Sequence, residues 1–162
     1  MFVAAVVLSA GVAAMTCRPT IPNGSQPPPE VLYSPEFSEG RLAEAYHAGR
    51  TRPDPHLHGN GVLWTVLTSD GRYLAPRSQV ERDGAIGTKL PWWMARPGDM
   101  TLSARRLDAA APPAKTSVGN STEPRFHSSG IWFPTTGCWE VTARTRGSAL
   151  TVVIDVEPAD AP

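Results

Sequence analysis

Short apolar segments separated by turn residues fill the chain beyond Gly59, and this pattern limits the fold more than any other feature. Val62–Thr68 is apolar on both of its alternating faces, which is typical of a strand inside a sheet that is covered on both sides. Met100–Leu107 alternates apolar and polar residues, as a half-buried strand does. About seven such segments, at turn intervals of about 8–12 residues, predict an all-β, immunoglobulin-like antiparallel β-sandwich. We place this domain at residues 59–157 and a tail at 158–162.

Turn residues predict how the strands are joined. Asp70-Gly71 is a strong two-residue hairpin signal, so Arg72–Ala75 is expected to run back antiparallel to the strand before it. Arg82-Asp83-Gly84 predicts a second turn, which leads into Ala85–Met94. The remaining predicted strands are Gly130–Phe133, Cys138–Arg144 and Ala149–Val156.

The composition excludes several other classes of protein. The chain has 17 Pro and 14 Gly with only 19% charged residues, which disfavours a helical bundle or a coiled coil. Its 15 Lys and Arg balance 15 Asp and Glu, so it lacks the basic charge of a nucleic-acid-binding protein. We therefore expect no nucleic-acid partner.

The first residues predict export. Residues 1–14 (MFVAAVVLSAGVAA) carry no charge and are almost wholly apolar, about as long as the apolar part of a signal peptide and too short to span a bilayer. The small residues at Val12–Ala14 fit cleavage before Met15. We expect a signal peptide at 1–14 and a secreted or envelope-associated protein. The alternative is a buried apolar element at the start of a cytosolic domain.

Residues 15–58 are predicted to form a proline-rich arm. Because proline fixes φ and offers no N–H group to a sheet, the arm should run extended over a surface. Ser38–His47 is the exception, since Ser38 can cap a helix, Leu42 and Tyr46 share one helical face and Gly49 can end it. One short helix is therefore expected within the arm.

Cys17 and Cys138 are the only cysteines. In an oxidising compartment two such thiols usually pair, which would close a loop of about 120 residues. Alternation in the strand 138–144 places Trp139 inward and Cys138 outward, where an arm laid across the sheet could be fastened. Two alternatives stay open. Ala14–Cys17 is a weak match to the lipidation site of bacterial lipoproteins, which would anchor the N-terminus to a membrane, and two unpaired buried thiols are expected if the chain is not exported.

His56 and His58 are the candidate metal ligands. Two His at positions i and i+2 of an extended chain face the same side, roughly 6.6 Å apart, within reach of one ion. A third ligand would have to come from Asp54, His47 or His127. The plainer interpretation is a proline-rich loop with ordinary surface histidines.

Trp92 and Trp93 are the candidate binding residues. Adjacent strand residues face opposite sides, so one interpretation places one ring in the core and the other on the surface. An exposed Trp there could stack on a sugar ring or anchor a protein partner. The plainer interpretation buries both rings.

No pattern of catalytic residues stands out. The sequence has no G-x-S-x-G motif, and His127, Ser128 and Ser129 are chain neighbours rather than groups drawn together from separate segments. The carboxylates are scattered and form no pair at a spacing that predicts glycosidase chemistry. We expect neither catalysis nor a cofactor.

Several segments resemble a known group of proteins, and we refer to them as the signature segments. They are Cys17–Ser25 (CRPTIPNGS), His58–Gly61, Pro91–Trp93, Arg105–Asp108 and Gly130–Thr142 (GIWFPTTGCWEVT). They resemble a group of uncharacterised bacterial secreted or lipoprotein-like proteins over most of residues 17–156, in which Val31–Pro55 is an insertion. The resemblance implies an envelope location, a compact β domain and a Cys17–Cys138 bridge, and it implies no catalytic residues.

These features together predict an exported β-sandwich module that binds an envelope protein or a glycan, without catalysis. The alternative function is a metal-binding protein or metalloenzyme that uses His56 and His58. In either case the protein is expected in the cell envelope or outside the cell.

Overall fold

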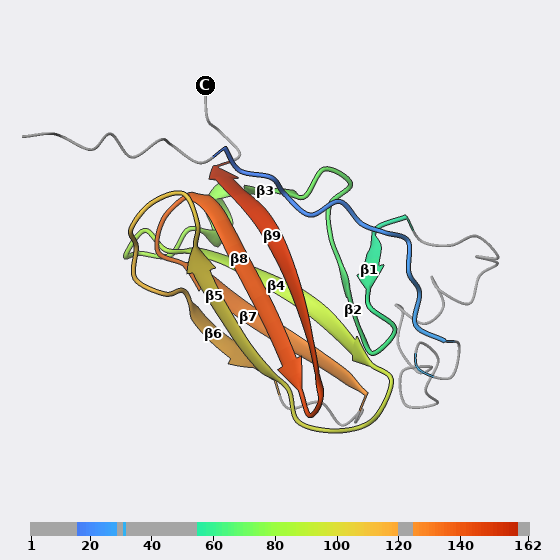
Figure 1. The fold of residues 1–162 in the computed structure, drawn as a ribbon. Coiled ribbons are helices and arrows are strands. Elements are labelled where there is room, and N and C mark those ends of the chain that lie inside the picture. Colours follow the sequence, from blue (N-terminus) through green and yellow to red (C-terminus); the bar gives the residue numbers. More distant parts are fainter. Residues whose placement is uncertain (1–15, 29–30, 32–54, 120–124, 159–162) are drawn as a thin grey trace, which may run out of the picture.

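The computed structural model describes residues 16–28, 31, 55–119 and 125–158. In these residues the chain forms nine strands and one short 3-10 helix, arranged as two sheets packed face to face (Figure 1). The elements are β1 (Leu57–Gly59), β2 (Leu63–Val66), β3 (Arg72–Ala75), the 3-10 helix η2 (Arg77–Gln79), β4 (Ile86–Met94), β5 (Thr101–Arg106), β6 (Lys115–Val118), β7 (Phe126–Phe133), β8 (Gly137–Thr145) and β9 (Ser148–Pro158).

The order of the strands identifies the type of sandwich. The five-stranded sheet has the order β1-β2-β4-β7-β6, and the four-stranded sheet has the order β3-β9-β8-β5. With β1 set aside, β2, β4, β7 and β6 take the places of strands A, B, E and D of an immunoglobulin constant-type domain, while β5, β8 and β9 take those of C, F and G. The predicted all-β, immunoglobulin-like sandwich is therefore confirmed. One pair, β3 with β9, is parallel, and the other pairs are antiparallel.

The core between the sheets follows from the alternation of residues along the long strands. In β8, Trp139, Val141 and Ala143 point inward and are fully buried. They share one cluster with Ile131 and Phe133 of the other sheet, and the ring centroids of Phe133 and Trp139 are 5.3 Å apart. A fully buried apolar side chain of this size contributes about 1.5–3 kcal/mol, so this layer holds the two sheets together.

The Asp70-Gly71 turn forms, but the predicted hairpin is wrong. Gly71 has a φ of 68°, and the Asp70 side chain accepts a hydrogen bond of 3.0 Å from the backbone N–H of Arg72. After this turn, however, β3 joins the opposite sheet in parallel with β9, where the N–H of Asp155 donates to the Gly71 carbonyl. The strand before the turn already has β1 on one side and β4 on the other, so it offers β3 no free edge.

Other strands begin or end at different places than predicted. Leu57–Gly59 belongs to the five-stranded sheet rather than to the arm, and the unpredicted edge strand Lys115–Val118 pairs with β7. β7 begins at Phe126, ahead of the predicted Gly130, and β9 continues to Pro158. The predicted helix Ser38–His47 and the predicted signal peptide lie outside the described residues.

The described part of the arm wraps around one edge of the sandwich. A disulfide joins Cys17 to Cys138 on the outer face of the four-stranded sheet, which confirms that pairing. Thr20 then exchanges two hydrogen bonds of 2.8 Å with the backbone of Val153 in β9. Figure 1 shows this blue segment running from β9 across to β1.

The arm continues onto the outer face of the five-stranded sheet. The Asn23 amide donates to the Gly59 carbonyl (2.8 Å) and accepts from the Gly59 N–H (3.1 Å). Beyond it, the Trp64 indole N–H donates to the Ser25 hydroxyl (3.2 Å), and Val31 packs in one cluster with Trp64. The strand β2 is consequently buried on both of its faces, as its sequence predicts.

We expect the Cys17→Ser/Cys138→Ala double variant to unfold more easily than the wild type. The bridge joins residues separated by 121 positions, and closing a loop of that length stabilises a fold by about 4–5 kcal/mol in the chain-entropy model. Urea denaturation measures the difference in the free energy of unfolding. The matched control is wild-type protein reduced with dithiothreitol, which should unfold at the same midpoint as the variant. An unchanged midpoint in both samples would contradict the role assigned to the bridge.

Candidate functional site

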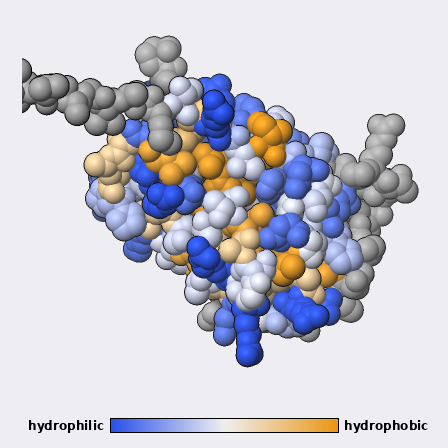
Figure 2. Space-filling view, in the orientation of Figure 1, coloured by the Kyte–Doolittle hydropathy of each residue, from blue (hydrophilic) through white to orange (hydrophobic). Residues whose placement is uncertain are grey.

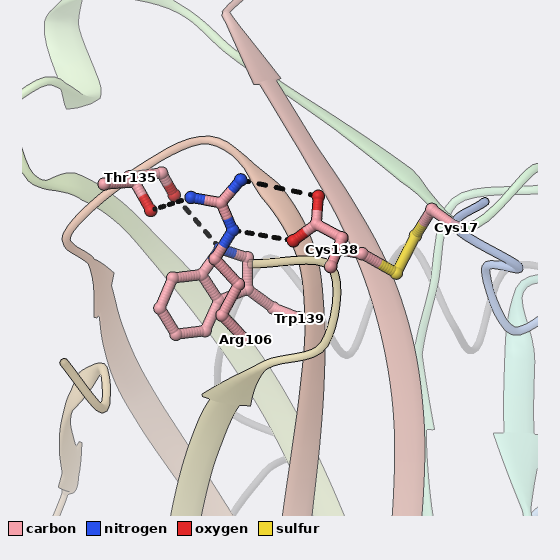
Figure 3. A network of polar contacts seen from close by, with 6 residues as sticks. Cys17, Arg106, Thr135, Cys138 and Trp139 are labelled. Atoms are coloured by element: carbon pink, nitrogen blue, oxygen red, sulfur yellow. Dashed lines mark hydrogen bonds and ion pairs between the residues drawn. A yellow bond between two sulfur atoms is a disulfide. The ribbon is translucent and has the colours of Figure 1, made fainter. Parts of the chain in front are cut away.

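Residues from three signature segments meet beside the disulfide, as Figure 3 shows. Arg106 donates from Nε to Asp108 (2.6 Å) and from Nη1 to the Thr135 hydroxyl (3.0 Å). The Trp139 indole N–H donates to the Thr135 carbonyl (3.0 Å). The hydrogen bond from Arg106 holds the pKa of Asp108 below its ordinary value. All of these bonds tie β5, β8 and their connecting turns together, so this part of the signature is structural.

Gly137 is part of the same arrangement. Its φ is 123°, a conformation that side chains disfavour, and a Cβ there would lie 2.6 Å from Nη2 of Arg106. The missing side chain therefore lets the guanidinium lie directly against the backbone. Both features favour glycine at this position.

The outer face of the four-stranded sheet carries polar contacts between its strands. Arg105 forms an ion pair with Glu140 (2.7 Å), and the hydroxyls of Thr142 and Thr151 are hydrogen-bonded to each other (2.9 Å). Figure 2 looks onto the side of β8 and β9, where hydrophilic and hydrophobic residues are interspersed. These polar side chains bond to one another across the strands of the sheet.

Trp92 and Trp93 face opposite sides of the five-stranded sheet, as predicted, but both rings are buried. Trp92 lies in the core between the sheets, where its indole N–H donates to the Ser129 hydroxyl (3.0 Å). Trp93 lies on the outer face, in a cluster with Val31 and against the ring of Phe126, 5.5 Å away between centroids. Both rings are therefore buried, as the plainer interpretation has it, and no ring is exposed to stack on a ligand, because the arm and β7 cover the place that Trp93 occupies.

His56 and His58 lie at the start of the five-stranded sheet. Nδ1 of His56 is 3.2 Å from the Leu67 carbonyl oxygen, whereas His58 is in the middle of β1. Among the described residues, no three His, Cys, Asp or Glu side chains gather around a common point. Two of the proposed third ligands, Asp54 and His47, lie outside the described residues.

The third proposed ligand, His127, is on the same row of the sheet as His58 but far from it. The registers place Thr65 of β2 and Trp92 of β4 between the two histidines. Three strand spacings separate them by roughly 14 Å. His127 and His58 therefore do not share an ion.

The ring of His58 is partly buried beside the arm. Its Nδ1 is buried, with no hydrogen-bond partner among the described residues. Burial lowers the pKa of His58 below its ordinary value of 6.5, and the backbone of Ile21 acts in the opposite direction. The folded protein therefore favours the neutral imidazole.

His56 and Trp93 line the same cavity, at an edge of β4. One edge of β4 pairs with β7, and the other pairs with β2 only at Trp92–Met94. Along this second edge, no described strand lies beside Thr88–Pro91. The cavity has a volume of about 640 Å³. Its walls are mainly apolar and include Val66, Leu67, Tyr73, Leu90, Phe126 and Ile154. This lining is suited to enclosing an apolar group.

Trp132, in β7, is an aromatic side chain that faces outward and stays partly exposed. Its neighbours Ile131 and Phe133 fill the core, so Trp132 lies on the outer face of the five-stranded sheet, partly exposed. A Cβ at Gly130 would be 2.6 Å from Cη2 of the indole, and one at Gly87 would be 3.5 Å from Cδ1. Because opposite ends of the ring come close to two glycines of the sheet, the indole lies flat on the backbone.

Two charged residues hold the Trp132 ring in this position. The indole N–H donates to Oε1 of Glu81 (3.2 Å), which comes from the turn between η2 and β4. Nζ of Lys115 lies 5.5 Å from the ring centroid, and Lys115 is directly opposite Trp132 in the register of β6 with β7. Two segments outside β7 thus contact the ring.

A hollow lies on each side of Trp132. The first has a volume of about 830 Å³ and a floor of small residues, with Gln79 and Lys89 at its rim. The small residues of the first hollow include Gly87, Ser117, Ser128 and Gly130. The second, of about 590 Å³, lies between Pro113 and Pro134 and includes Arg82 and Asp83. We call Trp132 with these two hollows the Trp132 face.

Sequence reasoning placed Trp132 in a strand but did not select it as a binding residue. The signal was present, because two apolar neighbours point inward and Gly130 lies two positions earlier on the same outer face. The local pattern could not show that Glu81 and Lys115, which come from other segments, lie beside the Trp132 ring.

No family model and no curated protein matches the chain. Among solved structures, the crystal structure of the Lin-41 filamin domain is similar, with 10% sequence identity and a TM-score of 0.43, over 59% of this chain and 91% of that chain. The strand order defines the described chain as an immunoglobulin-like β-sandwich domain. Within its described residues, no helix combines the length and the apolar composition of a membrane span.

We expect Gly137→Ala to destabilise the fold more than Gly147→Ala. Both glycines have a positive φ, 123° and 89°, so both substitutions strain the backbone. The methyl group added at Gly147 meets nothing within 4 Å, whereas that at Gly137 collides with Arg106. The free energies of unfolding, from urea denaturation, should differ by about 1–2 kcal/mol. Equal losses would show that the guanidinium moves aside without cost.

We expect the stability of the protein to fall as His58 takes up a proton. The pKa of His58 is lowered in the folded state, so its contribution is present above pH 6.5 and is lost as the pH falls from 6.5 through the folded pKa. An NMR titration should give a pKa for His58 below 6.5. The free energy of unfolding of His58→Gln should change less between about pH 8 and about pH 5 than that of the wild type. Equal changes would contradict this assignment.

Proposed function

We propose that this protein is an exported, envelope-associated binding module, without catalytic activity, that contacts an envelope protein or a glycan through the Trp132 face. The observation that carries the proposal is the position of Trp132, whose ring lies on a rigid sheet between two hollows. Tryptophan is among the residues that most often dominate the energy of binding, because it offers a large apolar area with a polar N–H group.

The disulfide and the N-terminal sequence support export. Disulfides persist in oxidising compartments and are rare in the cytosol. The Cys17–Cys138 bridge therefore agrees with the uncharged apolar segment 1–14, which has the character of a signal peptide. The resemblance of the signature segments to bacterial secreted proteins points to the same location.

The charged residues that pair with one another within the scaffold support binding rather than catalysis. Arg106 and Asp108 belong to the network beside the disulfide, and Arg105 pairs with Glu140 across β5 and β8. These pairs connect strands of the scaffold. The Trp132 face presents an aromatic ring, and aromatic residues are enriched at recognition surfaces.

Cell fractionation and sedimentation with cell envelopes test the proposal. The full chain is expressed in a bacterial host, and the intact mass of the envelope or secreted fraction should show loss of residues 1–14 and of the two thiol hydrogens. The purified mature protein is then sedimented with isolated bacterial envelopes. Trp132→Ala is expected to lower the apparent affinity about tenfold or more, as loss of a central aromatic contact does.

Leu74→Ala is the control variant for this experiment. Leu74 is an exposed apolar residue of β3, 54% exposed, outside the Trp132 face, so this variant should sediment as the wild type does. Equal sedimentation of folded Trp132→Ala and wild type would exclude the Trp132 face as the contact surface. Recovery of the uncleaved chain from the cytosol with both thiols free would exclude export.

A further inference from the structure

We infer that the Trp132 face binds a neutral, unbranched oligosaccharide, with one pyranose ring stacked on the indole of Trp132. The inference rests on the proposed binding function and names the class of ligand for the same site. Three features carry it: the orientation of the ring, the balance of charge around it, and the hollows on its two sides.

The orientation of the indole suits the apolar face of a sugar. Its two ends lie over Gly130 and Gly87, so one face of the ring is turned to the sheet and the other outward. A pyranose with equatorial hydroxyls has a flat face of C–H groups and directs its hydroxyls sideways. Stacking on Trp132 covers those C–H groups and leaves the hydroxyls free for polar neighbours. The hydrogen bond to Glu81 fixes the ring before a ligand arrives, which lowers the entropy lost on binding.

The polar residues of the first hollow suit hydroxyl groups. Ser117, Ser128 and Gln79 line it, and their side chains both donate and accept hydrogen bonds, as sugar hydroxyls do. Such groups give orientation and specificity to a ligand that is held mainly by an apolar surface.

Charge in both hollows is balanced among the described residues. The first hollow has one acidic residue, Glu81, and one basic residue, Lys89. In the second hollow, Glu81 and Asp83 are balanced by Arg82 and Lys115. A surface without net charge offers no long-range attraction to an anionic or a cationic polymer, so its electrostatics favour a neutral ligand.

The two hollows indicate the length of the ligand. They flank the ring from opposite sides, one reaching β4 and β6 and the other reaching Pro113 and Pro134. A sugar stacked on Trp132 therefore has space for a further sugar unit in each direction. The exposed side chain of Lys115 now lies over the ring, and the stacked sugar would displace it to a position where its ammonium donates to a hydroxyl.

Isothermal titration calorimetry and NMR with defined saccharides test the inference. The neutral probes are β-1,4-linked hexasaccharides of glucose, xylose and N-acetylglucosamine, each with its trisaccharide, and the acidic probe is polygalacturonate. At least one neutral hexasaccharide should bind, more tightly than its trisaccharide. Its affinity should stay the same at about 0.05 M and about 0.5 M salt, since no ion pair is involved. The bound saccharide should shift the indole N–H resonance of Trp132.

Two variants separate stacking from folding. Trp132→Ala removes the platform and should weaken binding about tenfold or more. Gly130→Ala keeps the indole but places a methyl group 2.6 Å from it, which tilts the ring away from the sheet and should also weaken binding. Gly98→Ala is the matched control, because Gly98 lies outside the Trp132 face and a Cβ there meets nothing within 4 Å. Thermal unfolding of all three variants confirms that each is folded.

The outcomes distinguish this inference from the proposed function. If none of the neutral hexasaccharides binds while Trp132→Ala still abolishes sedimentation with envelopes, the saccharide inference fails and the binding function stands. If sedimentation does not depend on Trp132 either, both fail. Binding of polygalacturonate alone, weakened by salt, would assign an acidic ligand and refute the neutral one. Saccharide binding that Gly130→Ala and Trp132→Ala leave unchanged would refute the stacking position.

Discussion

Attachment of the arm to both sheets is the constraint on which the rest of this structure depends. The disulfide fixes Cys17 on β8, the hydrogen bonds of Thr20 add the arm to β9, and Asn23 holds it to β1. Free edges expose unpaired N–H and C=O groups, and the arm bonds to such groups where it passes. It also buries Trp93 and its neighbours, whereas Trp132 stays partly exposed between its two hollows.

Features that depend on neighbours in the sequence were predictable, and those that depend on distant segments were not. The inward direction of Trp139 and the outward direction of Cys138 follow from alternation along one strand, so both were predicted correctly. The Asp70-Gly71 motif specified its own conformation but carried no information on which strand edge was free. The exposure of a Trp depends on what covers it: alternation places both Trp93 and Trp132 on the outer face, but Trp93 is buried in a cluster with Val31, whereas Trp132 is partly exposed.

The network beside the disulfide stabilises the fold, whereas the Trp132 face is the candidate binding surface. Arg106, Asp108 and Gly137 form a compact network of short hydrogen bonds next to the disulfide, where small changes would disturb the strand that carries it. Trp132, although part of a signature segment, points away from that network. Its ring rests on backbone that regular strands hold rigid, and a rigid support is what precise recognition requires.

The distance along the chain between Cys17 and Cys138 has a consequence for the order of assembly. The bridge spans 121 positions, and β3 likewise needs β9, the last strand, as its partner. Contacts between the first and last parts of a polypeptide form slowly, because a long loop must close before they are made. The sandwich therefore closes only after Cys138 and β9 have been synthesised, and the N-terminal cysteine must wait for a partner from a segment made much later.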